Sequence, residues 1–338
     1  MKANFTSAAA IVLALFALSA LAQDPPGEGE VGKKFDVETR PIPSFDLRHP
    51  ERREFGALEF RGGIELLSTQ QGFGGLSALR VDADGEGFVA ISDRGRWLRG
   101  RLVYTAGIVS GVADMEMAPM LGADGKPLAL RGWFDTESLA EDGGIFYVGI
   151  ERVNQIVRFD YGKDGFSARG EPIAVSPEIK SLPYNRGLEA MAFVPRDMPL
   201  GGTLIAISER GLDEAGNIRA FLIGGPSPGN FSFARSKDFE ITGAIVIPSR
   251  ELLILERSFS LLRGAGMRIR RFPLTAIKPG AVLQGTVVFE ADRNYQIDNM
   301  EGIAVHRSRQ GETVLTLLSD DNFNPLQRTI LLQFTLAR

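Results

Sequence analysis

The sequence predicts an all-β protein, a β-propeller of five four-stranded blades. The chain consists of short apolar runs separated by Gly and Asp turns, and a two-run pattern recurs about every 57 residues. In each copy a short apolar segment is followed by a second apolar run that ends in an acid. These acids are Asp93, Glu151, Glu209, Glu256 and Asp320. A sixth, irregular blade remains the alternative.

Each repeat divides into runs of strand length. The expected strands of the first two blades are 75–81, 88–94, 98–105 and 112–120, then 137–140, 145–152, 155–161 and 172–176. Those of the third and fourth are 188–193, 203–210, 218–223 and 230–239, then 241–247, 252–257, 267–272 and 282–289. The fifth blade has only 301–305, 313–320 and 328–336. We expect an N-terminal strand to complete it and close the ring, supplied by a strand–turn–strand pair within 57–68, because closure removes exposed sheet edges.

The N-terminus predicts export. Residues 1–22 combine Lys2, an apolar run over 8–18 and the small-residue site Ala20-Leu21-Ala22, which is typical of a signal peptide cleaved near Ala22. A membrane anchor is disfavoured because the run is shorter than the roughly 20 residues a span needs. We therefore expect a periplasmic or secreted protein without membrane insertion after cleavage. Residues 23–54, rich in Pro, Gly and charge, predict a flexible lead-in, and 55–338 the propeller domain.

Net charge and residue counts exclude several classes of binding partner and metal site. The formal net charge is −4 and basic runs are short, so no nucleic-acid partner is expected. The chain has no Cys and two His, which disfavours zinc or copper sites and leaves little room for a Ser-His-Asp triad. A small-molecule substrate and a monomer are the expectation.

The repeated acids should gather on one face. Glu137, Glu189 and Glu301 open inner strands, and the second-strand acids end beside those openings. Two interpretations stay open. Four second-strand acids are followed by Arg, which favours a belt of inter-blade salt bridges. Alternatively, oxygen donors could bind calcium or another hard cation. The candidate ligands are Asp93, Glu137, Glu151, Asn185, Glu189, Glu209, Glu256, Asn299, Glu301 and Asp320.

Several motifs in order resemble one family. They are Gly74-Gly75-Leu76-Ser77, Ile91-Ser92-Asp93-Arg94-Gly95, Asp135-Thr136-Glu137-Ser138, Asn185-Arg186-Gly187-Leu188-Glu189, Leu255-Glu256-Arg257-Ser258, Asn299-Met300-Glu301-Gly302 and Ser319-Asp320-Asp321-Asn322-Phe323. As a set spanning about 60–336 they resemble the phytase-like propeller family with esterase-like activity. The resemblance implies a secreted bacterial propeller related in architecture to calcium-dependent phytases, with phosphoester or ester hydrolysis as its activity.

The leading hypothesis is therefore a metal-dependent hydrolase of phosphoesters or esters. Glu137, Glu189 and Glu301 would be metal ligands or activate water. Lys180, Arg186 and Arg328 are candidates to contact a substrate phosphate, and each is equally explained as a plain surface charge. The rival is a non-catalytic periplasmic propeller that binds a hard cation, a small ligand or a protein. A lactonase-like propeller around calcium is a third, less supported alternative.

Overall fold

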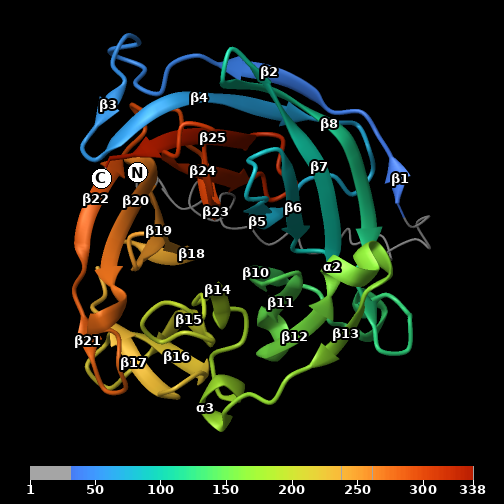
Figure 1. Ribbon diagram of the computed structural model, residues 1–338, viewed down its shortest axis with the longest axis vertical. Coiled ribbons are helices and arrows are strands. Elements are labelled where there is room, and N and C mark those ends of the chain that lie inside the picture. The colour runs from blue at the N-terminus through green and yellow to red at the C-terminus, as the bar shows by residue number, and fades with distance from the viewer. Residues whose placement is uncertain (1–31, 237, 261, 338) are drawn as a thin grey trace, which may run out of the picture.

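The computed structural model describes residues 32–236, 238–260 and 262–337. Within them the strands form five sheets around a central channel, which confirms the all-β class and the five-bladed propeller (Figure 1). The part of the chain that is described contains no sixth sheet.

Consecutive antiparallel strands build each blade from the channel outward. Blades 1 and 2 contain β5 (Leu76–Val81), β6 (Gly87–Ser92), β7 (Arg96–Thr105) and β8 (Ile108–Pro119), then β10 (Thr136–Asp142), β11 (Ile145–Ile150), β12 (Gln155–Asp160) and β13 (Arg169–Pro172). Blades 3 and 4 contain β14 (Leu188–Phe193), β15 (Thr203–Leu212), β16 (Ile218–Gly224) and β17 (Gly229–Phe233), then β18 (Glu240–Ile247), β19 (Glu251–Ser260), β20 (Gly264–Pro273) and β22 (Thr286–Ala291). Blade 5 contains β23 (Asn299–Arg307), β24 (Thr313–Asp320), β25 (Thr329–Leu336) and β4 (Leu58–Leu67).

Short elements fill the connections. β9 (Leu121–Gly122) extends the sheet of blade 2, and β21 (Val282–Leu283) extends that of blade 3. The run expected as one strand over 282–289 is thus two strands shared between neighbouring blades. The helical turns are α2 (Tyr161–Asp164), α3 (Pro177–Lys180), η1 (Leu128–Arg131), η2 (Glu151–Val153), η3 (Gly165–Ser167) and η4 (Leu274–Ala276).

The ring closes through the N-terminal strand, as expected. β4 pairs antiparallel with β25, with Leu58 opposite Leu336 and Leu66 opposite Thr329, and blue β4 lies beside red β25 in Figure 1. β4 is one strand rather than the expected strand–turn–strand pair. The backbone bends at Gly62, where φ is 153° and the register with β25 shifts, so the Gly pair makes a bend within a strand instead of a turn.

Much of the expected lead-in belongs to the fold. β1 (Lys33–Lys34) pairs with β8, and β2 (Glu38–Ile42) and β3 (Glu54–Phe55) pair with β4. Phe45 and Phe55 are fully buried and pack against each other with ring centroids 5.1 Å apart. Apolar burial therefore holds this segment onto the propeller despite its Pro- and charge-rich composition. The expected signal peptide lies outside the described residues, and no helix among the described residues is long and apolar enough to span a bilayer.

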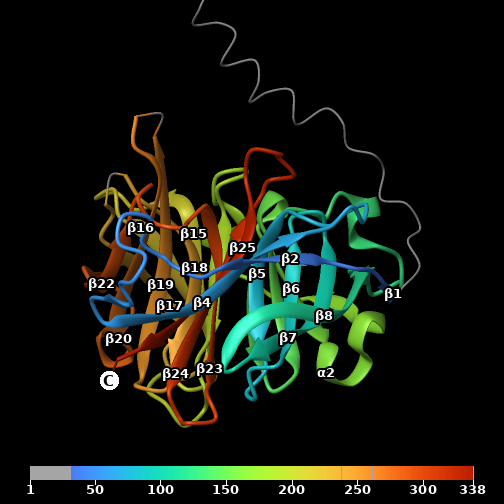
Figure 2. The same cartoon turned by 90° about the horizontal axis from the view of Figure 1, so that it is seen from above.

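One face of the disc collects the functional candidates. The inner strands β5, β10, β14, β18 and β23 all begin there, and the second strands end there. We call it the acid face. In Figure 2 it is the upper edge, from which the β19–β20 hairpin and the β24–β25 loop rise.

Candidate functional site

Every inner strand carries a β-bulge at the same place near its start. The register to the second strand skips one residue in all five blades. The skipped positions, which we call the bulge residues, are Ser77, Glu137, Glu189, Thr242 and Glu301. A bulge re-aims the extra side chain relative to the regular pleat. Fivefold repetition of the bulge thus turns the three predicted inner-strand acids, with Ser77 and Thr242, toward the mouth of the channel.

A second ring comes from the adjacent strands. In each blade the residue before the bulge pairs with a partner on the second strand, and the residue following that partner is the ring position. The five ring positions are Asp93, Glu151, Glu209, Arg257 and Asp320. The sequence repeat had placed Glu256 in this set. The pairing register shows that Arg257 holds the fourth place.

Glu256 lies instead in the interior of the sheet, away from the other acids. It is opposite Ile241 on β18 and is fully buried. Its carboxylate accepts hydrogen bonds from Arg268 Nε at 2.7 Å and from Arg270 Nη2 at 2.7 Å, both on β20. A one-residue step along a strand moves a side chain to the opposite face. Glu256 therefore stabilises blade 4 and is not grouped with the proposed metal ligands.

Arg257 compensates one half of the acid cluster. Its guanidinium donates hydrogen bonds to Glu301 and to Asn299 Oδ1, the latter at 2.7 Å. Its Nη2 lies 3.7 Å from Glu189 Oε1 and 3.6 Å from Glu209 Oε1. Asn299 Nδ2 donates to Glu301 Oε1 at 2.8 Å. Two of the three predicted catalytic acids, Glu189 and Glu301, are thus engaged with an arginine.

The other half has no such partner. Asp93, Glu137, Glu151 and Asp320, which we call the open half, form no salt bridge with any described Lys, Arg or His. Hydrogen bonds stabilise two of them, from Gly187 N to Glu151 Oε1 at 2.8 Å and from Asn322 N to Asp320 Oδ1 at 2.7 Å. Blades 5, 1 and 2 supply these residues, so the open half is a continuous sector of the ring.

Burial and mutual repulsion hold protons on these acids. Burial, reinforced by Glu189 and Glu301, raises the pKa of Glu137 well above its ordinary value. Burial, only partly opposed by Arg94, raises the pKa of Asp93 to about 7, and burial with Asp135 raises the pKa of Glu151 to about 8. Burial and Glu301 raise the pKa of Asp320 strongly. Carboxyl groups that exchange protons near neutral pH are suited to general acid–base catalysis.

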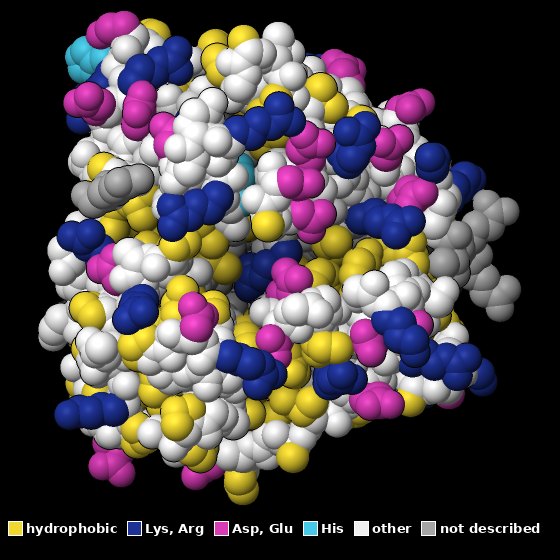
Figure 3. Space-filling model, viewed as in Figure 1, with side chains coloured by type: hydrophobic (Ala, Val, Ile, Leu, Met, Phe, Trp, Pro, Cys, Tyr) yellow, Lys and Arg dark blue, Asp and Glu magenta, His cyan; other side chains and the backbone are white. Residues whose placement is uncertain are grey.

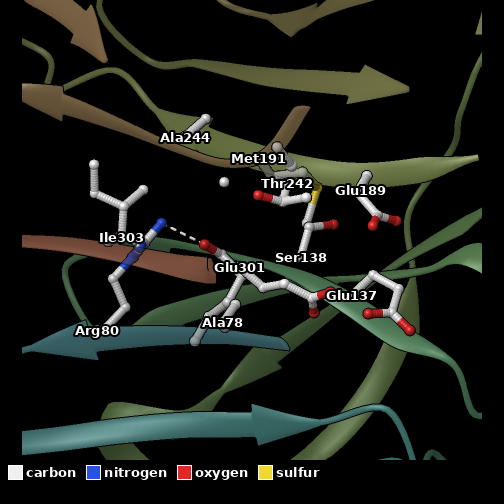
Figure 4. A pocket seen from close by; sticks show the side chains of 13 residues that line it. Ala78, Arg80, Glu137, Ser138, Glu189, Met191, Thr242, Ala244, Glu301 and Ile303 are labelled. Atoms are coloured by element: carbon white, nitrogen blue, oxygen red, sulfur yellow. Dashed lines mark hydrogen bonds between the residues drawn. The ribbon is translucent and has the colours of Figure 1, made fainter. Parts of the chain in front are cut away.

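Four of the five bulge residues, all except Ser77, line a narrow cavity on the channel axis. Its volume is about 10 Å³, which is room for about one water molecule, and all five inner strands line it. Figure 4 shows the carboxylates of Glu137 and Glu189 at one end and Arg80 at the other. Arg80 is buried and donates to the carbonyl oxygens of Ile303 at 3.4 Å and of Leu139, so it bridges β5, β10 and β23 across the channel.

Arg80 separates the two faces of the channel. Burial lowers the pKa of Arg80 to about 10, still far above neutrality, so it remains charged. The face opposite the acid face is hollowed at its centre, where Lys or Arg and Asp or Glu side chains meet (Figure 3). The acid cavity beside Arg80, which we call the pit, holds about one water molecule, so a larger chemical group has to lie at its mouth.

The oxygen donors of the open half suit a hard cation such as calcium in chemical type. As they stand, however, no three Asp, Glu, His or Cys side chains in the described ranges converge closely enough to bind a metal ion. Cation binding would require these carboxylates to turn toward one another.

The two asparagines predicted as metal ligands lie in different environments. Asn299 is committed to Arg257 and Glu301, whereas Asn185 is exposed on the loop before β14. Of the three predicted phosphate contacts, Lys180 donates to Gln155 and Arg328 donates to Gln296 Oε1 at 3.1 Å. Arg186 alone among the three has no side-chain hydrogen bond or ion pair within the part of the chain that the structure describes. It is exposed two residues from Leu188, where β14 begins.

The expected salt-bridge belt is partial. Arg210 pairs with Glu240 and Arg257 with Glu301, each reaching the next blade. Arg152 pairs instead with Asp135 of its own blade at 3.4 Å. Arg94 stacks over Phe323, 3.5 Å from the ring centroid. Two of the four acid-Arg repeats thus tie neighbouring blades together.

Three residues of this site were not predicted as part of it. Asp135 precedes the blade 2 bulge with φ 66° and lies near enough to raise the pKa of Glu151. Its place in the motif Asp135-Thr136-Glu137 was the available signal. Arg257 could have been found only from the strand register. Arg80 gives no sequence signal beyond a charge inside an apolar run.

Comparison with known proteins places the chain. A family model described as "Phytase-like: Esterase-like activity of phytase" matches residues 71–323. No curated protein matches the chain. Among solved structures, U3-55K aligns at 9% identity and TM-score 0.37 over 83% of this chain and 99% of its own. The Myxococcus xanthus glutaminyl cyclase aligns at 11% identity and TM-score 0.39 over 78% and 92%. Scores this low carry no argument about function, whereas the family model covers most of the propeller: the chain belongs to the phytase-like family.

Proposed function

We propose that the protein hydrolyses phosphoester or carboxylic ester bonds at the open half of the acid face. The observation that carries this proposal is the cluster of four carboxyl groups there without an ion-pair partner among the described residues, next to a cavity with room for about one water molecule. Membership of the phytase-like family supports the reaction class.

Glu137 is the central residue of the proposed reaction. It occupies the bulge of β10, lines the cavity and, unlike Glu189 and Glu301, has no arginine contact in the described structure. Asp93, whose pKa burial raises only to about 7, takes as a carboxylate a proton from water while the water oxygen bonds to phosphorus or to the carbonyl carbon. The bond to the alcohol oxygen then breaks, and Glu137, whose pKa is raised well above its ordinary value, returns a proton to the alcohol. Arg186 is placed to attract a phosphate near the rim.

A hard divalent cation belongs to this proposal. Asp93, Glu137, Glu151 and Asp320 would hold it, and when bound it would polarise the scissile group and neutralise the crowded carboxylates.

Hydrolysis of 4-nitrophenyl phosphate and 4-nitrophenyl acetate, with and without calcium, tests the proposal. We expect turnover that falls at least about 100-fold in Glu137→Gln. Glu141→Gln, at the other end of the same strand, is the matched control and should retain activity. Absence of turnover by folded protein under every condition would refute the proposed hydrolase activity.

A binding protein without chemistry is the second candidate. The engagement of Glu189, Glu209 and Glu301 by Arg257 favours it, because half of the acid cluster is then explained by structure alone. Tight calcium binding by calorimetry combined with no turnover would support this candidate.

A further inference from the structure

The acid face carries the most exposed large apolar side chains of the described chain. They are Leu326, Leu262, Phe259 and Tyr184, at 90%, 89%, 68% and 66% exposure, and we call them the apolar rim. Single exposed apolar residues are common on protein surfaces. Here all four lie on connections of one face: the loop before β14, the β19–β20 hairpin and the β24–β25 loop.

Phe259 is aimed at the mouth of the cavity by strand geometry. The β19–β20 pairing is regular from Glu256 to Ser260, so side chains alternate strictly there. Arg257 points into the acid cluster, and Phe259, two residues on, points to the same side. Two residues of strand span about 7 Å, which places Phe259 just above the ring of acids. The ring of Phe259 is therefore exposed on the same side of β19 as Arg257.

Tyr184 lies beside the open half. Arg152 lies 4.3 Å from the Phe134 ring centroid and 5.8 Å from that of Tyr184, and it pairs with Asp135. Across the mouth, Arg94 stacks on Phe323. Aromatic rings and arginine side chains stacked on them thus border the acid cavity in several blades, and both make good contacts with apolar or aromatic groups.

We infer that the substrate is a small ester or phosphoester head attached to an apolar body, with the head at the mouth of the acid pit and the body lying on the apolar rim. The inference rests on the proposed function. The pit holds about one water molecule, so it offers no cavity for a bulky polar body. The apolar rim can instead bury apolar surface of a substrate, which favours binding. The chemistry shared by the candidate bodies is an aryl ring or an alkyl chain.

Kinetics on matched phosphate esters test the inference. We expect kcat/KM to rise from glycerol phosphate to 4-nitrophenyl phosphate and to octyl phosphate, the last two separating aryl from alkyl bodies. Phe259→Ser and Tyr184→Ser should raise KM for the apolar esters about tenfold and leave glycerol phosphate unchanged. Ile108→Ser, an exposed position on the hairpin of the opposite face, is the control and should change nothing. Equal loss on all substrates, or no preference in the wild type, would overturn the inference.

A binding measurement separates this inference from the proposed function. Calorimetry with methylphosphonate, phenylphosphonate and octylphosphonate needs no turnover. Tighter binding of the apolar phosphonates, lost in Phe259→Ser, supports the apolar rim even if no ester is hydrolysed. Equal binding of all three, or binding of none, overturns it. Urea unfolding of each variant shows that these surface changes leave the fold intact.

Discussion

Replacing Arg257 with Gln removes the one cation that contacts three buried acids. Glu189, Glu209 and Glu301 expose only 7%, 10% and 6% of their side chains. Removing one partner of a buried ion pair costs about 3 to 5 kcal/mol, because a charge is left uncompensated. Arg257 itself keeps 24% exposure, so water partly replaces it and we expect the lower end, about 3 kcal/mol at pH 8.

The loss should be smaller at pH 5. Burial raises the pKa of Glu189 and of Glu301 above the ordinary value, so more of each carboxyl group is protonated at pH 5 than at pH 8 and less compensation by a cation is needed. Urea unfolding at the two pH values measures this. With a slope of about 3 kcal/mol per M, the midpoint should fall by about 1 M at pH 8.

The control is Arg263→Gln on the adjacent hairpin. Arg263 and Asp238 form a pair 3.1 Å apart in which the side chains are 72% and 60% exposed, so its loss should cost less than about 1 kcal/mol. If Arg257→Gln costs no more than Arg263→Gln, or costs as much at pH 5 as at pH 8, the compensation argument is refuted.

Further predictions concern the same molecule. Because burial raises the pKa of Asp93 to about 7 and that of Glu151 to about 8, the folded state binds more protons than the unfolded state, so unfolding free energy should fall from pH 5 to pH 8.5 in denaturant titrations; a flat or rising profile would contradict this. Glu256→Gln should lower stability by about 3 kcal/mol, because it leaves two buried arginines uncompensated, with calcium affinity unchanged by calorimetry. A weaker calcium affinity in this variant would show that Glu256 does contribute to the proposed metal site. Arg80→Met should not lower stability, since the exchange removes a buried charge, but it should open the pit to larger ligands; an unchanged preference for small phosphonates would show that Arg80 does not limit the pit.

The sequence predicted the five blades and the closing strand because strand patterns are local. Each run of alternating or continuous apolar residues between Gly and Asp turns reports its own strand, and the missing fourth strand of the last blade indicated closure from the N-terminus. Composition predicts a flexible segment at 33–54, but it does not show that the side chains of Phe45 and Phe55 are buried in the core. Such contacts join residues far apart in sequence, and no local pattern encodes them.

The site was predicted to the level of a cluster but not of a geometry. The motif acids Glu137, Glu189 and Glu301 were assigned correctly to inner-strand starts, since an acid opening an apolar strand is visible in the sequence. Their division into a compensated and an open half depends on where a single arginine lies in three dimensions.

In the fourth blade a shift of one residue decides whether an acid or an arginine occupies the ring position. Glu256 and Arg257 are adjacent, and a repeat read by spacing alone assigns the acid to the ring. The bulge at Thr242 sets the register so that Arg257 takes the ring position while Glu256 enters the sheet. An acid at that position would have given a ring of five carboxylates around the axis. With arginine there, charge balance is local to blades 3, 4 and 5, and the unpaired acids are left in blades 5, 1 and 2. The asymmetry between the compensated half and the open half thus follows from the register of one strand pair.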